Sequence, residues 1–215
     1  MRIRVFLADD HAVVRDGLRA LLEGLGDMAV VGEAGDGREA VDRICALSPD
    51  VAVLDVAMPG LNGIEAASHL RECCPSVRVV ILSMHGSAEH VFRALRAGVF
   101  GYLLKESAGR QVALAIRAAA NGQTYLDAGL GPSVLLRHDR RGEGACSPLE
   151  RLSAREREVL QLVVEGHSSA DLAETLFLSP KTVETYRSRL MHKLDVRDLP
   201  SLVKFAVECG LTPPR

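Results

Sequence analysis

A set of acidic, basic and hydroxyl side chains stands at the ends of short apolar runs in the first half of the chain. Its members are Asp9, Asp10, Asp55, Ser83 and Lys105. Three carboxylates brought together would repel one another, and hard oxygen ligands in that number suit Mg²⁺. A carboxylate beside a cation, an ammonium group and a hydroxyl can accept a phosphoryl group, because these neighbours stabilise the phosphoryl oxygens. The residue types therefore predict magnesium-assisted phosphoryl transfer to an aspartate.

The hydrophobic pattern predicts the elements that must position these side chains. Five short runs rich in Val, Ile and Leu are typical of buried strands: Ile3–Ala8, Ala29–Glu33, Val51–Val56, Val77–Ser83 and Gly101–Leu104. Each is followed by an amphipathic stretch: Val13–Leu25, Arg38–Leu47, Gly63–Cys73, Ala88–Ala97 and Gln111–Ala120. Because parallel strands need crossover helices, these repeats predict a five-stranded parallel sheet with helices on both faces. Ligands collect beyond the carboxyl ends of such strands, where the candidate residues stand.

Taken singly, most of these residues have an ordinary structural explanation. The Asp9-Asp10 pair could cap the following helix, Ser83 could simply end a strand, and Lys105 could lie on the surface. Asp55 differs, because it ends the apolar run VAVLD, where an unpaired buried carboxylate is costly. An aspartyl phosphatase of the haloacid-dehalogenase type would need a second aspartate two residues later, where this chain has Ala57. We therefore expect a phosphoacceptor rather than an enzyme.

Residues 1–122 resemble a receiver domain of the flavodoxin-like α/β class. The strings that carry the resemblance are VFLADDH, VAVLDVAMPGLNGIEA, VVILSMH and AGVFGYLLKES. The resemblance implies that Asp55 is the phosphoacceptor, that Lys105 pairs with the phosphoryl group and that Ser83 is the switch hydroxyl. It implies a Mg²⁺ site made of Asp10 directly, Asp9 mainly through water, Asp55 and the backbone carbonyl of Ala57. Tyr102 matches the aromatic residue that changes rotamer, and we expect phosphorylation to draw Ser83 and Tyr102 inward.

The chain after Gly122 changes character. Residues 123–148 are rich in glycine and proline towards their end, and we assign them to a linker. Residues 149–215 are helical in pattern, with a capping box at Ser153 and a Ser179-Pro180 helix start. The predicted helices are Ala154–Glu165, Ala170–Leu176, Pro180–Leu194 and Asp198–Cys209. The short turn between the second and third predicts a helix-turn-helix in an all-α domain.

The third of these helices has an apolar face and a basic face. Val183, Tyr186, Leu190 and Leu194 share one side. Between positions 181 and 193, Lys181, Arg187, Arg189 and Lys193 oppose only Glu184. One side of a recognition helix anchors it while the other meets phosphates and base edges, so the pattern favours DNA binding. A solvated surface helix remains the alternative.

The string LSAREREVLQLVVEGHSSADLAETLFLSPKTVETYRSRLMHKLDV resembles the LuxR-type DNA-binding domain. The resemblance implies a set of positions that face DNA: Lys181, Thr182, Glu184, Thr185, Arg187, Arg189 and Lys193. It also implies that the fourth helix supports dimerisation through Leu199, Leu202, Val203 and Ala206, although that helix could only cover the domain core. Tyr186 and His167 depart from the residues common at their positions.

Together the two halves resemble a response regulator of the NarL/FixJ family. That resemblance implies a sensor histidine kinase, double-stranded DNA and a second copy of the chain as partners. A regulator that only docks other proteins is the rival. No apolar run approaches the roughly 18 residues of a membrane span, and the N-terminus lacks a signal-peptide pattern, so we expect a cytoplasmic protein. The five cysteines lack zinc-site spacing and are expected to be reduced packing thiols.

Overall fold

The computed structural model describes residues 2–130, 148–209 and 211, in two compact units, Met1–Glu143 and Gly144–Arg215. Most of the predicted linker lies outside the described residues, and its boundaries remain a prediction. Among the helices described, none is both long and apolar enough to cross a bilayer.

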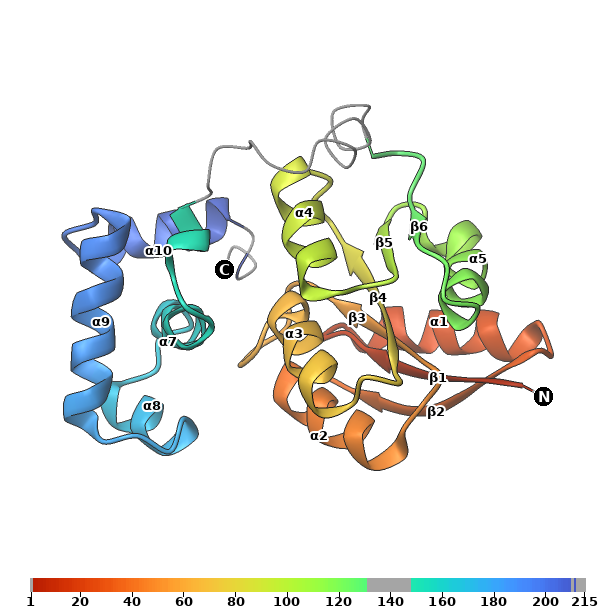
Figure 1. The fold of residues 1–215 in the computed structure, drawn as a ribbon, viewed down its shortest axis with the longest axis horizontal. Helices are drawn as coiled ribbons and strands as arrows, with labels where there is room; N and C mark the ends of the chain where they lie inside the picture. The colour runs from red at the N-terminus through yellow and green to blue at the C-terminus, as the bar shows by residue number, and fades with distance from the viewer. Residues whose placement is uncertain (1, 131–147, 210, 212–215) are drawn as a thin grey trace. The chain divides into compact units, whose positions relative to one another are not determined.

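The first unit is a parallel sheet with alternating helices (Figure 1). Its strands follow the order β2-β1-β3-β4-β5-β6, and every neighbouring pair is parallel. The strands are β1 (Ile3–Ala8), β2 (Met28–Ala34), β3 (Val51–Asp55), β4 (Arg78–Ser83), β5 (Gly101–Leu104) and β6 (Tyr125–Leu126). The helices are α1 (Ala12–Gly24), α2 (Gly37–Leu47), α3 (Gly63–Cys73), α4 (Ala88–Ala97) and α5 (Ala108–Ala120). The predicted flavodoxin-like class of fold is confirmed.

The sheet has six strands, so the predicted number of five was wrong. The sixth, β6, pairs Tyr125 with Gly101 and Leu126 with Tyr102, beyond the predicted end of the domain at residue 122. Its two residues carry no periodicity that could identify a strand. Asp127 then accepts hydrogen bonds from the backbone amides of Leu104 at 3.0 Å and Gly129 at 2.7 Å, which ties this segment to β5.

Two hydrophobic cores cover the two faces of the sheet. In β1, Phe6 and Ala8 belong to the core beneath α2, α3 and α4, whereas Val5 and Leu7 belong to the core beneath α1 and α5. Successive side chains of a strand point to opposite faces, so burial on both sides requires continuous apolar runs. This explains why β3 is apolar up to Asp55 and β4 is apolar from Val79 to Leu82.

The second unit is wholly helical over its described residues. A 3₁₀ turn, η1 (Pro148–Arg151), precedes α7 (Ala154–Val164), α8 (Ser169–Thr175), α9 (Pro180–Leu194) and α10 (Leu199–Glu208). Capping boxes begin α7 at Ser153 and α8 at Ser168, and Ser179 caps α9. The core joins all four helices through Leu160, Leu172, Val183, Leu190, Leu202 and Ala206. The predicted four-helix unit is confirmed.

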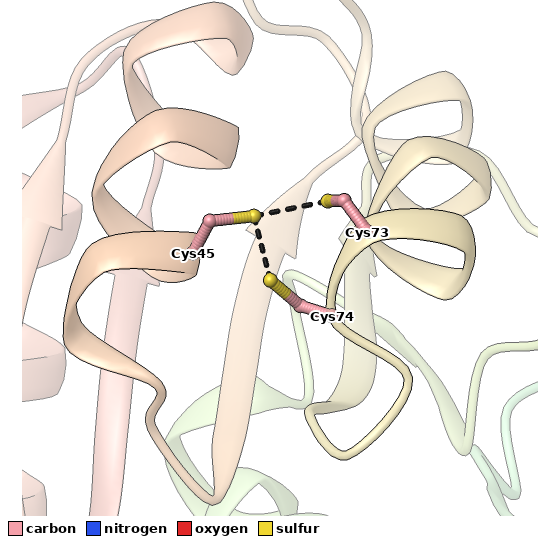
Figure 2. Close-up of side chains that lie close together, drawn as sticks. All are labelled: Cys45, Cys73 and Cys74. Carbon is pink, nitrogen blue, oxygen red and sulfur yellow. Dashed lines mark hydrogen bonds between the residues drawn. The ribbon is translucent and has the colours of Figure 1, made fainter.

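Three of the five cysteines lie together, which the sequence analysis did not predict. Cys45 at the end of α2 lies against Cys73 and Cys74 at the end of α3 (Figure 2). All three are free thiols, and Cys45 and Cys74 pack against the hydrophobic core, which agrees with the predicted reduced packing thiols. Cys146 lies outside the described residues, and Cys209 is half-buried in the second unit.

Candidate functional site

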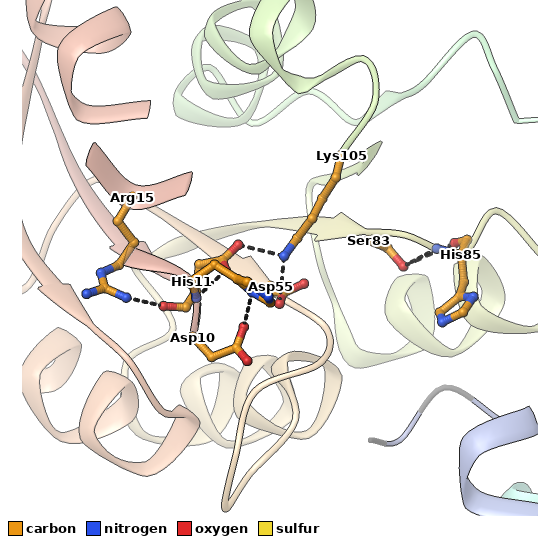
Figure 3. Close-up of polar contacts among 8 residues, drawn as sticks. Asp10, His11, Arg15, Asp55, Ser83, His85 and Lys105 are labelled. Carbon is orange, nitrogen blue, oxygen red and sulfur yellow. Dashed lines mark hydrogen bonds and ion pairs between the residues drawn. The ribbon is translucent and has the colours of Figure 1, made fainter. Parts of the chain in front are cut away.

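The carboxyl ends of β1, β3 and β5 bring three acidic residues and a lysine together (Figure 3). The ammonium of Lys105 lies 2.7 Å from Oδ2 of Asp9 and 2.8 Å from Oδ2 of Asp55. Asp10 stands beside them at the same edge. Parallel strands put their carboxyl ends on one side, so residues far apart in sequence converge there.

The site is buried and carries excess negative charge. Both Asp9 and Asp55 have side chains only 2% exposed, and that of Lys105 is 13% exposed. Burial, and then the charge of Asp9, raise the pKa of Asp55 although Lys105 opposes them. Burial disfavours the charged form of Lys105, but attraction and hydrogen bonds from Asp55 and Asp9 outweigh it and raise its pKa. Three carboxylates against one ammonium leave an excess of two negative charges, which fits a divalent cation.

His11 also belongs to this cluster, although the sequence analysis gave it no role. Its Nδ1 lies 2.6 Å from Oδ1 of Asp10 and 3.3 Å from Oδ1 of Asp9. The possible ligand atoms of these residues and Asp55 lie within 4.8 Å of one another. The only sequence signal was its position directly after two aspartates. Ala57 donates a backbone hydrogen bond to Asp55, and its predicted contact with a metal stays a prediction.

The two predicted switch residues meet at the backbone of His85. The buried Ser83 hydroxyl donates to the His85 carbonyl at 3.1 Å and accepts from its amide at 2.9 Å (Figure 3). The Tyr102 hydroxyl donates to the same carbonyl at 2.6 Å. Tyr102 has no exposed surface, and burial raises its pKa to about 12. Tyr102 therefore already lies inward in this structure, whereas the Ser83 hydroxyl is bonded to the His85 backbone and its turn towards Asp55 stays a prediction.

The loop after Asp55 requires glycine at position 63. The Gly63 amide donates to the Val56 carbonyl at 3.0 Å, and a Cβ at this residue would overlap the carbonyl of Asp55. Asn62 caps α3, because its side-chain oxygen accepts from the amides of Ile64 and Glu65. This close approach of α3 to the end of β3 holds the candidate acceptor in place.

All seven predicted DNA-facing residues lie on the solvent side of α9. Lys181, Glu184, Thr185, Arg189 and Lys193 are exposed, and Thr182 and Arg187 are half-buried. On the opposite side, Val183 and Leu190 are fully buried in the core of the unit, and Tyr186 and Leu194 pack against it. The predicted division of this helix into an anchoring face and an open face therefore matches the structure.

Several of these polar side chains are held by neighbouring helices. The Lys193 ammonium lies 2.6 Å from Oε2 of Glu156, on α7. Arg187 donates to the Ser169 hydroxyl at 2.8 Å, and that hydroxyl donates to Glu184. Lys181 and Arg189 have no ion pair with any described residue. These two are the cations on α9 that can meet a phosphate without breaking an ion pair.

The residues predicted for dimerisation divide into two pairs. Leu202 and Ala206 are buried in the core of the second unit, at 1% and 0% exposure. They cover the helix-turn-helix, as the alternative proposed, and offer no surface to a second chain. Leu199 is 46% exposed and Val203 is half-buried, so an interface on α10 would rest on these two.

Comparison with known proteins assigns both units to families. Residues 5–117 match the response regulator receiver domain, and residues 150–206 match bacterial regulatory proteins of the luxR family. The oxygen regulatory protein NreC of Staphylococcus haemolyticus is 38% identical over 211 residues, which cover 96% of this chain and 97% of that protein.

Solved structures give the same assignment. A LuxR-family two-component response regulator from Aurantimonas sp. SI85-9A1 is 33% identical, with a TM-score of 0.61, over 65% of this chain and 100% of that one. RcsB of Salmonella enterica serovar Typhimurium, bound to promoter P1flhDC with the phosphomimetic BeF₃⁻, is 27% identical with a TM-score of 0.67. That match covers 97% of this chain and 100% of RcsB. The chain therefore belongs to the DNA-binding two-component response regulators that join a receiver domain to a LuxR-type domain.

Proposed function

We propose that a sensor histidine kinase transfers a phosphoryl group to Asp55 and that phosphorylated copies pair on DNA in the cytoplasm. The observation that carries the proposal is the position of Asp55, buried at a strand end and ion-paired with Lys105 at 2.8 Å. Lys105 also contacts Asp9, so one ammonium serves two carboxylates. The carboxylates of this site outnumber its ammonium groups, so a further cation would be stabilised there. We propose that Mg²⁺ is held by Asp9, Asp10, Asp55 and the carbonyl of Ala57.

The chemistry requires one bond exchange. An oxygen of Asp55 forms a bond to phosphorus, the bond between phosphorus and the kinase imidazole breaks, and the leaving imidazole takes up a proton. Mg²⁺, when bound, offsets charge on the phosphoryl oxygens. Lys105 then pairs with the new dianion in place of the carboxylate. With Ala57 two residues after Asp55, the chain offers no second aspartate to speed hydrolysis, which supports a role as acceptor rather than enzyme.

Ser83 would be the residue that responds to phosphorylation of Asp55 and transmits it to the rest of the unit. Its hydroxyl donates to the His85 carbonyl, and a phosphoryl oxygen on Asp55 is a stronger acceptor because it is charged. Turning towards phosphate would release one hydrogen bond to His85, leaving Tyr102 as its remaining hydroxyl donor. Residues 84–87 lead into α4, and loss of this hydrogen bond would shift the equilibrium between their conformations. We therefore propose that this segment is the switch.

Acetyl phosphate and intact-mass spectrometry test the acceptor. We expect the wild type to gain one phosphoryl group per chain when Mg²⁺ is present, and Asp55→Asn to gain none. Asp16→Asn is the matched control, because Asp16 is exposed on α1 and is not one of the clustered carboxylates. Labelling of Asp55→Asn at the wild-type rate would show that another residue accepts the group.

Salt-dependent DNA binding tests the helix. We expect Lys181→Ala and Arg189→Ala each to weaken binding and to reduce the slope of log K against log salt by about one. Arg187→Ala should weaken binding as well, by freeing Ser169 and Glu184 in addition to removing a charge. Arg43→Ala, on α2 of the first unit, is the control. Unchanged slopes for both Lys181→Ala and Arg189→Ala would mean that another surface meets DNA.

A further inference from the structure

Three thiols meet at the ends of α2 and α3, in the first unit. The sulfur of Cys45 lies 2.9 Å from that of Cys73 and 2.6 Å from that of Cys74. Figure 2 shows the Cys45 side chain reaching from α2 towards both partners, with its sulfur facing each of theirs. All three sulfurs lie within 4.8 Å of one another. Three soft donor atoms thus converge on one small region.

The backbone at the two helix ends creates this arrangement. Helix α3 ends because Cys74 leaves the helical region, at φ −138° and ψ 63°, and Pro75 follows it. The Cys74 amide still donates to the Leu70 carbonyl at 2.7 Å, so the turn is tight. Two adjacent residues, Cys73 and Cys74, can therefore both approach Cys45, which neighbouring residues on a regular helix could not do.

The trio lies at the margin of the core, where Cys45 and Cys74 pack against it, and is not part of the proposed phosphoacceptor site. Cys73 is exposed, and Cys45 and Cys74 are half-buried, so solvent and small ions can reach the sulfurs. Helices α2 and α3 both start at the carboxyl edge of the sheet and run back, so their ends lie at its amino edge. Asp55 lies at the opposite edge. The function proposed above leaves these thiols without a role.

We propose that Cys45, Cys73 and Cys74 form a three-sulfur site for a thiophilic closed-shell cation, either Cu⁺ or Zn²⁺. Thiolates select these ions among the common biological metals. Each thiol releases one proton to solvent as its sulfur binds the metal, so three protons leave for three bonds. Three sulfurs complete a trigonal site for Cu⁺, whereas Zn²⁺ would add a solvent molecule as its fourth ligand.

The distances allow such a site after a small movement. With metal–sulfur bonds of about 2.3 Å, three sulfurs around one ion stand about 4 Å apart. The Cys45 sulfur must therefore move away from that of Cys73 by about 1.1 Å and from that of Cys74 by about 1.4 Å. Rotation about the Cα–Cβ bond of the exposed Cys73 and modest rotations of the other two supply this. No backbone rearrangement is needed, because the ligand atoms already lie within reach of one another.

Competition titrations of the full chain test the proposal. The reduced, metal-free protein is titrated anaerobically with Cu⁺ and, separately, with Zn²⁺, each against a chromophoric chelator. Co²⁺ serves as the spectroscopic probe, because sulfur-to-metal charge-transfer bands report thiolate ligands. We expect one ion per chain, and at least a tenfold loss of affinity in Cys45→Ser and in Cys73→Ser. Either ion, bound at one per chain and weakened in these variants, supports the site; the tighter ion need not be the natural one, because geometry and metal availability decide which metal a site holds in the cell.

Matched variants keep the test decisive. Cys146→Ser/Cys209→Ser removes the two other thiols and should bind metal as the wild type does. If Cys45→Ser fails to fold, Cys73→Ser provides the test, because it changes an exposed residue. Phosphorylation by acetyl phosphate reports whether each variant has folded. Absence of stoichiometric binding, wild-type affinity in both Cys45→Ser and Cys73→Ser, or a Cys45–Cys74 disulfide as the only modification of these thiols would overturn the proposal.

Discussion

Glu156 connects the start of α7 to the end of α9, and removing it should loosen the DNA-binding unit. Its Oε2 accepts hydrogen bonds from the Ser153 amide at 2.8 Å, from the Ser153 hydroxyl at 3.1 Å and from Lys193 at 2.6 Å. Glu156 is only 3% exposed, so water replaces few of these bonds. We therefore choose Glu156→Ala as the perturbation.

The size of the effect follows from these contacts. Loss of the reciprocal cap costs about 1 kcal/mol. The Lys193 side chain is 39% exposed, so solvent screening limits its ion pair to roughly 0.5–1 kcal/mol. The sum is about 2 kcal/mol, which for a unit of this size lowers the melting temperature by roughly 8–16 °C.

Hydrogen–deuterium exchange of the full chain, resolved by peptide, is the assay that separates the two units. Slowly exchanging amides of α7 should exchange about 30-fold faster in Glu156→Ala, and those of the first unit should not change. Glu174→Ala removes an exposed carboxylate on α8 and is the control. Equal α7 exchange rates in Glu156→Ala and Glu174→Ala would refute the role given to this residue.

The same contacts predict a dependence on pH. Burial disfavours the charged form of Glu156, but hydrogen bonds from Lys193 and Ser153 outweigh it and lower the pKa. The stabilisation is therefore present above the unfolded pKa of about 4.3 and is lost as the pH falls through the lower folded value. Glu156→Gln should flatten this acid limb of the stability of the second unit, as measured by exchange at several pH values.

Two further predictions concern the receiver unit. Gly63→Ala should lower the free energy of unfolding by more than about 2 kcal/mol, on the order of a severe core substitution, because its Cβ would overlap the carbonyl of Asp55. The same overlap should slow phosphorylation of Asp55. Gly109→Ala, with open space around it on α5, should be neutral or slightly stabilising, by up to about 1 kcal/mol, and denaturant unfolding of both variants checks this. Arg93 lies 3.5 Å from Glu65, with both side chains less than a tenth exposed. Arg93→Met should therefore destabilise the unit by about 3 kcal/mol, and adding Glu65→Leu should recover part of this; full additivity in the double-mutant cycle would contradict the pairing.

The sequence alone was enough for the elements and for the acidic site. Five apolar runs and the helices between them carry their own periodicity, and a parallel arrangement then places Asp9, Asp55 and Lys105 at one edge whatever the details of packing. For these predicted elements the structure moved only boundaries, as when α5 begins at Ala108 rather than Gln111. Convergence of strand ends is a property of topology, which is why the site could be predicted from positions along the chain.

Contacts between distant segments were decided only by the tertiary structure. Strand β6 exists because β5 leaves an edge that two residues can pair with, and Lys193 turns towards a carboxylate 37 positions earlier in the chain. The position of Leu202 in the core, and the meeting of Cys45 with Cys74, likewise depend on which helix ends lie together. Periodicity specifies which face of an element is apolar, whereas the partner of a side chain depends on packing between elements.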